Sequence, residues 1–188
     1  EPVCPADVKY GHLLEQTRDS LEQHEKHPLW VKAVRKTAFK RMFPFQNRMK
    51  LAGKALRFYQ KSGLRKIARG SGIMKLFPRN VREMETILPD VSGRGVVDEL
   101  GTIVPAKGQR IARVGMFRGC IMDVMFTETN VNTVRLLAEA GFEVVIPPAQ
   151  NCCGALHAHA GETEEAKKLA KRNIRAFREA EVDYIVSN

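Results

Sequence analysis

The C-terminal part of the chain alternates between short apolar segments and longer amphipathic ones, and this alternation constrains the fold more than any other feature. The apolar segments, residues 111–117, 142–146 and 182–186, have the length and composition of strands. The segments between them, residues 130–140 and 163–180, have helical periodicity. The order β-α-β-α-β predicts an α/β fold with a parallel sheet and right-handed crossovers.

Three of the four cysteines directly follow predicted strands. Cys120 comes after the first strand, and Cys152 and Cys153 come after the second. Because the carboxyl ends of parallel strands meet at one edge of the sheet, we expect the fold to gather these thiols. Soft sulfur ligands favour an iron–sulfur cluster, zinc or copper, and adjacent cysteines make a poor disulfide pair. The sequence therefore predicts a metal centre, with a further ligand expected after the third strand, close to Asn188.

Structural roles for the same residues compete with metal binding. A free cysteine is often simply a small buried side chain, which suits Cys120 alone better than a Cys-Cys-Gly loop beside it. Gly154 permits a turn with positive φ or a close approach of the backbone to a cluster. His157 and His159 alternate along the following loop. They could bind metal, but we expect them to hydrogen-bond around the cluster instead.

A second feature is the concentration of positive charge in one segment. Residues 26–82 contain 17 Lys or Arg and no Asp or Glu, whereas the rest of the chain has 14 basic and 21 acidic residues. Such a segment favours an anionic membrane face, an acidic subunit or nucleic acid as its partner. Its aromatic residues could stack on bases. They lie on amphipathic helical faces, however, so we expect membrane or partner contact and consider nucleic acid unfavoured.

These patterns divide the chain into four parts. Residues 26–88 are expected to form a basic helical region, residues 89–110 a Gly- and Pro-rich loop linker, and residues 111–188 the α/β domain. Residues 1–25 are expected to form a turn and a helix. No apolar run approaches the roughly 20 residues that span a bilayer. No secretory leader is visible either, so we expect a cytoplasmic protein.

Cys4 stands in the first of these parts and is followed by proline. A Cys-Pro pair ends the C-x₂-C-x₂-C-x₃-C-P run of ferredoxin-type cluster domains. Taken alone, the pair is more simply an isolated thiol near the N-terminus.

The cysteine motifs resemble those of a known family. Gly119-Cys120 and the run Asn151-Cys-Cys-Gly-Ala-Leu-His-Ala-His-Ala-Gly161 resemble the cysteine-rich CCG domain of the glycolate oxidase (glycolate dehydrogenase) iron–sulfur subunit. Heterodisulfide reductase and the lactate-utilisation iron–sulfur protein contain the same kind of domain. Residues 4–10 resemble the end of the family's ferredoxin-like 4Fe-4S domain, and the basic segment resembles its helical linker. Because the family carries further cysteine motifs on both sides, the chain resembles an internal piece with a truncated first CCG domain.

The resemblance implies a set of cluster-binding residues and a role. Iron–sulfur clusters of the 4Fe-4S type would be held by Cys4, Cys120, Cys152 and Cys153. Flavin-containing subunits would oxidise glycolate to glyoxylate, and the iron–sulfur subunit would pass the electrons towards a quinone at the inner face of the cytoplasmic membrane. We therefore expect an oxidoreductase subunit without a catalytic residue for glycolate itself. A lactate or heterodisulfide oxidoreductase subunit is an alternative, and so is a non-enzymatic zinc-binding module, although no compact zinc spacing is present.

Overall fold

The structure is a computed structural model that describes residue 5 and residues 8–188. Its four-stranded sheet has the order β1-β3-β2-β4. The strands are β1 (Ile103–Val104), β2 (Ala112–Phe117), β3 (Phe142–Val145) and β4 (Tyr184–Ser187). β2 pairs in parallel with both β3 and β4, whereas β1 runs antiparallel to β3. The predicted α/β class and the parallel arrangement of the three main strands are confirmed.

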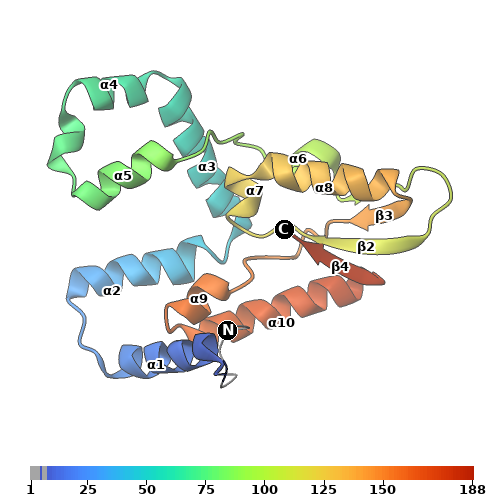
Figure 1. Ribbon diagram of the computed structural model, residues 1–188, viewed down its shortest axis with the longest axis horizontal. Helices are drawn as coiled ribbons and strands as arrows, with labels where there is room; N and C mark the ends of the chain where they lie inside the picture. The colour runs from blue at the N-terminus through green and yellow to red at the C-terminus, as the bar shows by residue number, and fades with distance from the viewer. Residues whose placement is uncertain (1–4, 6–7) are drawn as a thin grey trace.

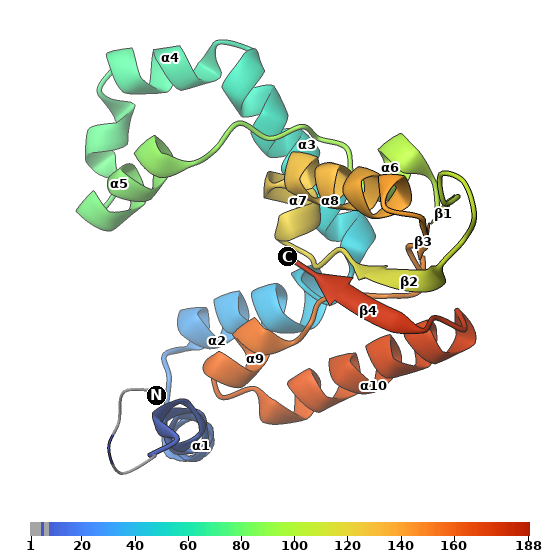
Figure 2. The same ribbon diagram turned by 45° about the vertical axis from the view of Figure 1, so that its right-hand side comes forward.

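Helices cover both faces of the sheet (Figures 1 and 2). One face carries α6 (Val96–Leu100) and α8 (Thr127–Glu139), and the other carries α10 (Thr163–Glu179). Two short helices, α7 (Met122–Met125) and α9 (Ala155–His159), follow β2 and β3. The core under α8 consists of apolar side chains from the helices and the two central strands: Val96, Met116, Val131, Val134, Val144 and Ile146.

Gly115, in the middle of β2, allows α10 to pack closely on the sheet. A Cβ atom at this position would lie 2.7 Å from Cδ1 of Phe177 and 3.1 Å from Cγ2 of Val182. The Phe177 ring also stacks on Phe117, with the ring centroids 5.7 Å apart. The absence of a side chain at residue 115 is therefore what brings α10 within contact distance of β2.

The N-terminal half is helical, as its apolar periodicity predicts. Its elements are α1 (Tyr10–His24), α2 (Leu29–Arg35), the π-helix η1 (Lys36–Met42), α3 (Gln46–Lys61), α4 (Leu64–Gly70), the 3-10 helix η2 (Ile73–Leu76) and α5 (Arg79–Ile87). α1 lies beside α9, and α3 lies against α7, so these helices dock on one end of the sheet domain (Figure 2). Among the described residues, no helix combines the length and hydropathy of a transmembrane span.

α4, η2 and α5 form a lobe that projects from the rest of the molecule (Figure 1). Its internal contacts converge on Glu85, whose carboxylate is bonded at 3.0 Å by Nε of Arg65 and at 2.9 Å by Nη2 of Arg69. The Tyr59 hydroxyl lies 3.3 Å from the same carboxylate. Burial by itself raises the pKa of Glu85, but the hydrogen bonds and charges of the two arginines together hold that pKa below its usual value.

Residues 89–110 differ from the expected loop linker. They contain α6 and β1, and Val96 at the start of α6 is fully buried. The Gly and Pro content indicated a loop because neither element is long enough to show a periodic pattern. α6 is held by a hydrogen bond from the Gly95 amide to Asp98 Oδ2 at 2.8 Å. The two-residue β1 exists through its pairing with the edge of β3.

Gly115→Ala is expected to lower the free energy of unfolding by about 1–3 kcal/mol, because the added methyl group forces α10 away from β2. Gly70→Ala is a matched control, since a Cβ at residue 70 meets no atom within 4 Å. Urea unfolding measures both variants. Equal stabilities of the two variants would contradict the proposed packing.

Glu85→Gln is expected to destabilise the protein at neutral pH and to have less effect in acid. Because the pKa of Glu85 is lowered by folding, its contribution is present above the unfolded pKa, about 4.3, and is lost as the pH falls through the folded pKa. Urea unfolding between pH 7 and pH 3 tests this. The control Glu83→Gln, two residues from Glu85, removes an exposed ion pair with Arg79 and should change stability little at any pH.

Candidate iron–sulfur site

The cysteines meet where β2 and β3 end at the carboxyl edge of the sheet. The Sγ atoms of Cys120 and Cys152 lie 3.3 Å apart, although 32 positions separate the two residues in the sequence. Both are buried, with exposed fractions of 5% and 1%. Cys153 follows directly and is exposed. The parallel sheet thus brings Cys120 and Cys152 into contact and places Cys153 at the solvent side of the pair.

Hydrogen bonds shift the pKa values of the three thiols in different directions. The hydrogen bond between the Cys120 and Cys152 thiols lowers the pKa of Cys120, while burial acts in the opposite direction. The same bond raises the pKa of Cys152 to about 11. The pKa of Cys153 is raised as well, first by its hydrogen bond to Cys152 and then by burial. The lowered pKa of Cys120 favours its thiolate, which is the form that binds a metal.

Backbone amides at the starts of two short helices also face the sulfur atoms. The amide of Ile121 lowers the pKa of Cys120, and the amide of Gly154 acts in the same way on Cys152. The Ala155 amide lies 3.4 Å from Sγ of Cys153. These N–H groups stabilise negative charge on sulfur, whether on a free thiolate or on a thiolate bound to iron.

A cavity of about 240 Å³ opens beside the sulfur atoms. Apolar side chains form much of its wall: Phe117, Ile121, Met122 and Leu156. Ser187 and Asn188, at the end of β4, close another side. The third parallel strand therefore ends at the same cavity as the first two.

Three buried side-chain amides fix the loops that carry the cysteines. Gln150 accepts a hydrogen bond from the Arg118 amide at 3.0 Å and donates one to the Met116 carbonyl at 3.0 Å, which ties the β3 loop to the end of β2. Asn130 donates to the Arg118 carbonyl at 2.9 Å. Asn173, in α10, donates to the Cys152 carbonyl at 2.9 Å and accepts from the Asn151 amide at 2.8 Å.

Sequence reasoning missed these amides because none belongs to a motif. The available signal was an Asn or Gln at a position whose neighbours in the helix or strand are apolar. Asn173, for example, stands on the buried side of α10 with Leu169, Ala176 and Phe177.

A buried carboxylate links the N-terminal helices to the same edge of the sheet. Asp123 is fully buried, and burial raises its pKa despite the hydrogen bonds it accepts. Its Oδ1 accepts from the Val96 amide at 2.7 Å, and its Oδ2 accepts from Gln46 Nε2 at 2.9 Å. Nε of the buried Arg118 lies 3.9 Å from Oδ2. Asp123 therefore joins α3, α6 and the loop before Cys120 in one polar network.

The other predicted site residues have different surroundings. Gly154 has φ 88°, the left-handed conformation expected for it. His157 is fully buried, and its Nε2 donates to the Phe39 carbonyl of η1 at 2.8 Å. His159 is exposed and pairs through Nδ1 with Glu15 at 2.8 Å. Neither histidine lines the cavity beside the cysteines, and Cys4 lies outside the described residues.

The chemistry of the donor set limits the metal centres that these residues fit. Within the described part of the chain, no group of three or more His, Cys, Asp or Glu side chains surrounds a position for a single metal ion. Thiolates are soft donors that suit an iron–sulfur cluster or zinc. Cys120, Cys152 and Cys153 line the same cavity and are the residues that would hold such a group.

Two family models match the chain. The model for the linker region of the glycolate oxidase iron–sulfur subunit matches residues 30–88, and the model for the cysteine-rich domain, CCG, matches residues 114–188. No solved structure matches the chain significantly.

Curated relatives are similar over the whole chain or over part of it. A probable glycolate oxidase iron–sulfur subunit of Bacillus subtilis is 47% identical over 188 residues, which is 100% of this chain and 42% of that protein. Lactate utilization protein A of Geobacillus kaustophilus is 40% identical over 75 residues, which is 40% of this chain and 30% of that protein. An uncharacterized iron–sulfur protein of Methanococcus maripaludis is 35% identical over 75 residues, 40% of this chain and 15% of that protein.

The chain thus spans 42% of the length of the relative that matches it from end to end. The two family models agree with that similarity: one matches the basic helices, and the other matches the domain that carries the thiols. Residues 114–188 thus match the cysteine-rich CCG domain, and the chain as a whole is similar to a glycolate oxidase iron–sulfur subunit.

Proposed function

We propose that this chain is part of an electron-transfer subunit that carries an iron–sulfur cluster on Cys120, Cys152 and Cys153. The observation that carries the proposal is the meeting of Cys120 and Cys152, with Cys153 beside them, at one edge of a parallel sheet. When bound, a cluster supplies one-electron redox chemistry. The cluster type we propose is 4Fe-4S, with the remaining ligands contributed by other cysteines of the full-length protein.

The residues of the chain have three tasks in this proposal. The thiolates hold iron, and the amides of Ile121, Gly154 and Ala155 stabilise negative charge at the sulfur atoms. The apolar wall of the cavity limits the access of water and thereby influences the reduction potential. Asn173, Gln150 and Asn130 keep the two loops in position.

Glycolate is the substrate we propose for the complete enzyme. Flavin-containing partner subunits would oxidise it to glyoxylate, and the electrons would pass through this subunit to a quinone. The relative that matches the whole chain carries the glycolate oxidase name, whereas the lactate utilization relatives match only about two fifths of the chain. That difference favours glycolate over lactate, and no residue of this chain is proposed to act on glycolate directly.

We also propose a role for each of the four parts of the chain. Residues 1–25, with Cys4, would end a ferredoxin-like 4Fe-4S domain, and residues 26–88 would be the basic linker. Residues 89–110 would connect this linker to residues 111–188, which would begin the first CCG domain. The family matches at residues 30–88 and 114–188 support the second and fourth parts. The basic charge of residues 26–82 supports peripheral contact with the anionic inner face of the cytoplasmic membrane.

Cys120→Ser, Cys152→Ser and Cys153→Ser are each expected to remove one cluster from the full-length protein. Replacing a thiolate with a hydroxyl removes a soft ligand from iron. Iron and sulfide analysis after anaerobic reconstitution, with EPR of the reduced protein, measures the loss. Cys4→Ser is the matched control, because it should abolish a different cluster signal. A colourless protein that binds only zinc would rule out the proposal.

Asn173→Ala is expected to weaken cluster binding about 10–100-fold, as the loss of a supporting hydrogen-bond partner does at metal sites. The substitution frees both the Cys152 carbonyl and the Asn151 amide. Iron content under limiting iron measures the effect. Arg172→Ala, at the exposed neighbouring position, should bind iron normally. Circular dichroism and thermal unfolding of each variant check that α10 remains folded. Normal iron binding by a folded Asn173→Ala protein would contradict the role assigned to this residue.

A further inference from the structure

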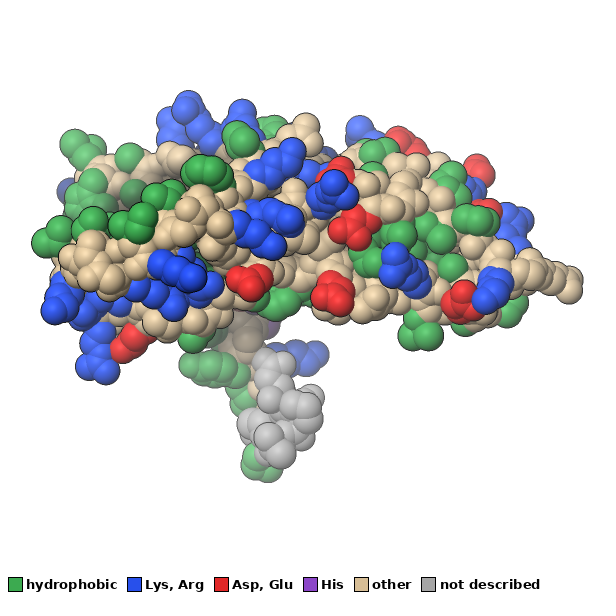
Figure 3. All heavy atoms as spheres, turned by 90° about the horizontal axis from the view of Figure 1, so that it is seen from above, with side chains coloured by type: hydrophobic (Ala, Val, Ile, Leu, Met, Phe, Trp, Pro, Cys, Tyr) green, Lys and Arg blue, Asp and Glu red, His purple; other side chains and the backbone are tan. Residues whose placement is uncertain are grey.

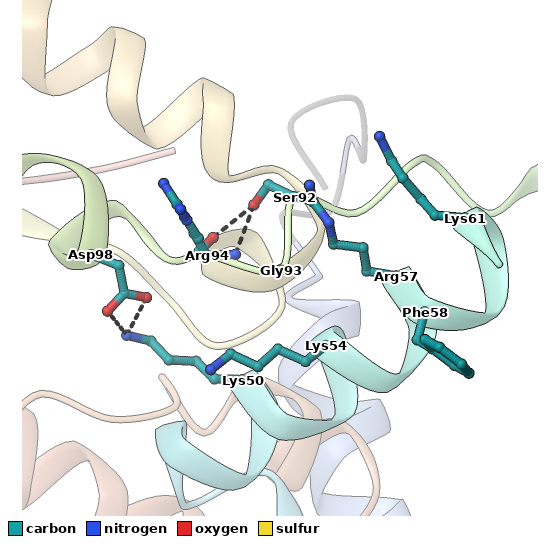
Figure 4. A pocket seen from close by; sticks show the side chains of 9 residues that line it. All are labelled: Lys50, Lys54, Arg57, Phe58, Lys61, Ser92, Gly93, Arg94 and Asp98. Carbon is teal, nitrogen blue, oxygen red and sulfur yellow. Dashed lines mark hydrogen bonds and ion pairs between the residues drawn. The ribbon is translucent and has the colours of Figure 1, made fainter.

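The basic segment carries a cavity that is separate from the cysteines. This cavity, of about 690 Å³, lies between α3 and the loop that precedes α6 (Figure 4). Its volume falls within the range of about 300–1,000 Å³ that is usual for small-molecule sites. Five cations and one carboxylate line it: Lys50, Lys54, Arg57, Lys61, Arg94 and Asp98.

One of the cations pairs with the single carboxylate, and a second acts on it through its charge alone. Nζ of Lys50 lies 2.9 Å from both oxygens of Asp98, as Figure 4 shows. Lys54 acts on the same carboxylate through its charge, and contributes to the low pKa of Asp98, which burial alone would raise. The Asp98 carboxylate is therefore already paired with a cation of the protein.

Arg57, Lys61 and Arg94 are left without an acidic partner. In the described part of the chain, none of the three forms an ion pair with an acidic side chain. Arg57 and Lys61 also border a neighbouring hollow that contains Asp90 and Glu128. Asp90 pairs instead with Arg65, at 3.6 Å. Five positive groups thus line a cavity that contains one carboxylate, that of Asp98, and a bound anion would stabilise this excess of positive charge.

The backbone holds these cations in a defined arrangement. Arg57 and Lys61 are four residues apart and so lie on the same side of α3. Gly93 has φ 73°, and a Cβ there would lie 2.8 Å from Cδ of Arg57, so the loop rests directly on the arginine stem. The Ser92 hydroxyl donates to the Arg94 carbonyl at 2.7 Å and accepts from the Arg94 amide at 3.2 Å, which fixes the turn before Arg94.

The wider surface agrees with this arrangement. Figure 3 shows Lys and Arg side chains gathered over the half of the molecule that contains α3, α4 and α5, with few acidic ones among them. In the lobe of α4 and α5, however, Arg65 and Arg69 both pair with Glu85. The cavity beside α3 differs from the lobe because its cations surround an open space and not a buried carboxylate.

We propose that this cavity binds a small ligand or headgroup that carries two or more phosphate groups. Arginine side chains bind phosphate in a bidentate manner, and lysines add charge without a directional requirement. A single phosphate offsets only part of the positive charge of the five cations that line the cavity, whereas a ligand with two or more phosphate groups offsets more of it. The proposal is independent of the iron–sulfur cluster and of the substrate of the enzyme.

Titration calorimetry of the full-length protein with pyrophosphate and with orthophosphate tests the site. Pyrophosphate is expected to bind at least about tenfold more tightly than orthophosphate. The double variant Arg57→Gln, Arg94→Gln should weaken pyrophosphate binding about tenfold or more. The control Lys171→Gln, Arg172→Gln removes the same charge from exposed positions of α10 and should bind as the unmodified protein does. Equal weakening in both variants, or no binding of pyrophosphate at all, would overturn the proposal.

A second arm distinguishes a lipid headgroup from a free ligand. Vesicles of phosphatidylcholine are compared with vesicles that also contain a phosphoinositide bearing two ring phosphates. If the ligand is a headgroup, the protein sediments with the second kind only, pyrophosphate competes, and the double variant stays in the supernatant. If the ligand is free, pyrophosphate binds in calorimetry and sedimentation is the same with both kinds of vesicle. Sedimentation with phosphoinositide vesicles that persists in the double variant would show that another surface binds the lipid and would overturn the headgroup assignment.

Discussion

The parallel pairing of β2 with β3 and β4 is the constraint on which the candidate site depends. Parallel strands all end at one edge of their sheet, so the loops after them converge whatever their separation along the chain. This is how Cys120 and Cys152 come into contact. An antiparallel pairing of β2 and β3 would place the same two loops at opposite edges and leave no common site.

Convergence of the loops does not by itself set the positions of the sulfur atoms. That precision comes from Gln150, Asn130 and Asn173, which hydrogen-bond to the backbone shortly before Cys120 and at Cys152. These amides are buried, so their own hydrogen-bonding capacity has to be met inside the protein. In the proposed electron-transfer role, such loops would limit the rearrangement of the cluster ligands.

The N-terminal helices are connected to this edge of the sheet through packing and polar contacts. Gly53 of α3 lies so close to α7 that a Cβ there would be 2.6 Å from Cγ1 of Val124. Gln46 reaches Asp123, and His157 reaches the carbonyl of Phe39. α3 and η1 of the basic segment are thus packed against the sheet domain, whereas the lobe of α4, η2 and α5 projects from it. A loose tail could attract anions equally well, but it could not hold a cavity of defined shape.

The sequence alone determined the α/β class, the three main strands and their helices, because their apolar periodicity is local. It also determined which residues carry soft ligands and where positive charge concentrates. Tertiary structure decided what periodicity cannot express: α6 and β1, which are too short for a pattern and exist through burial of Val96 and pairing with β3. It likewise decided that His157 contacts η1 and His159 contacts Glu15. Those partners lie more than 100 positions away, and only the folded chain brings them together.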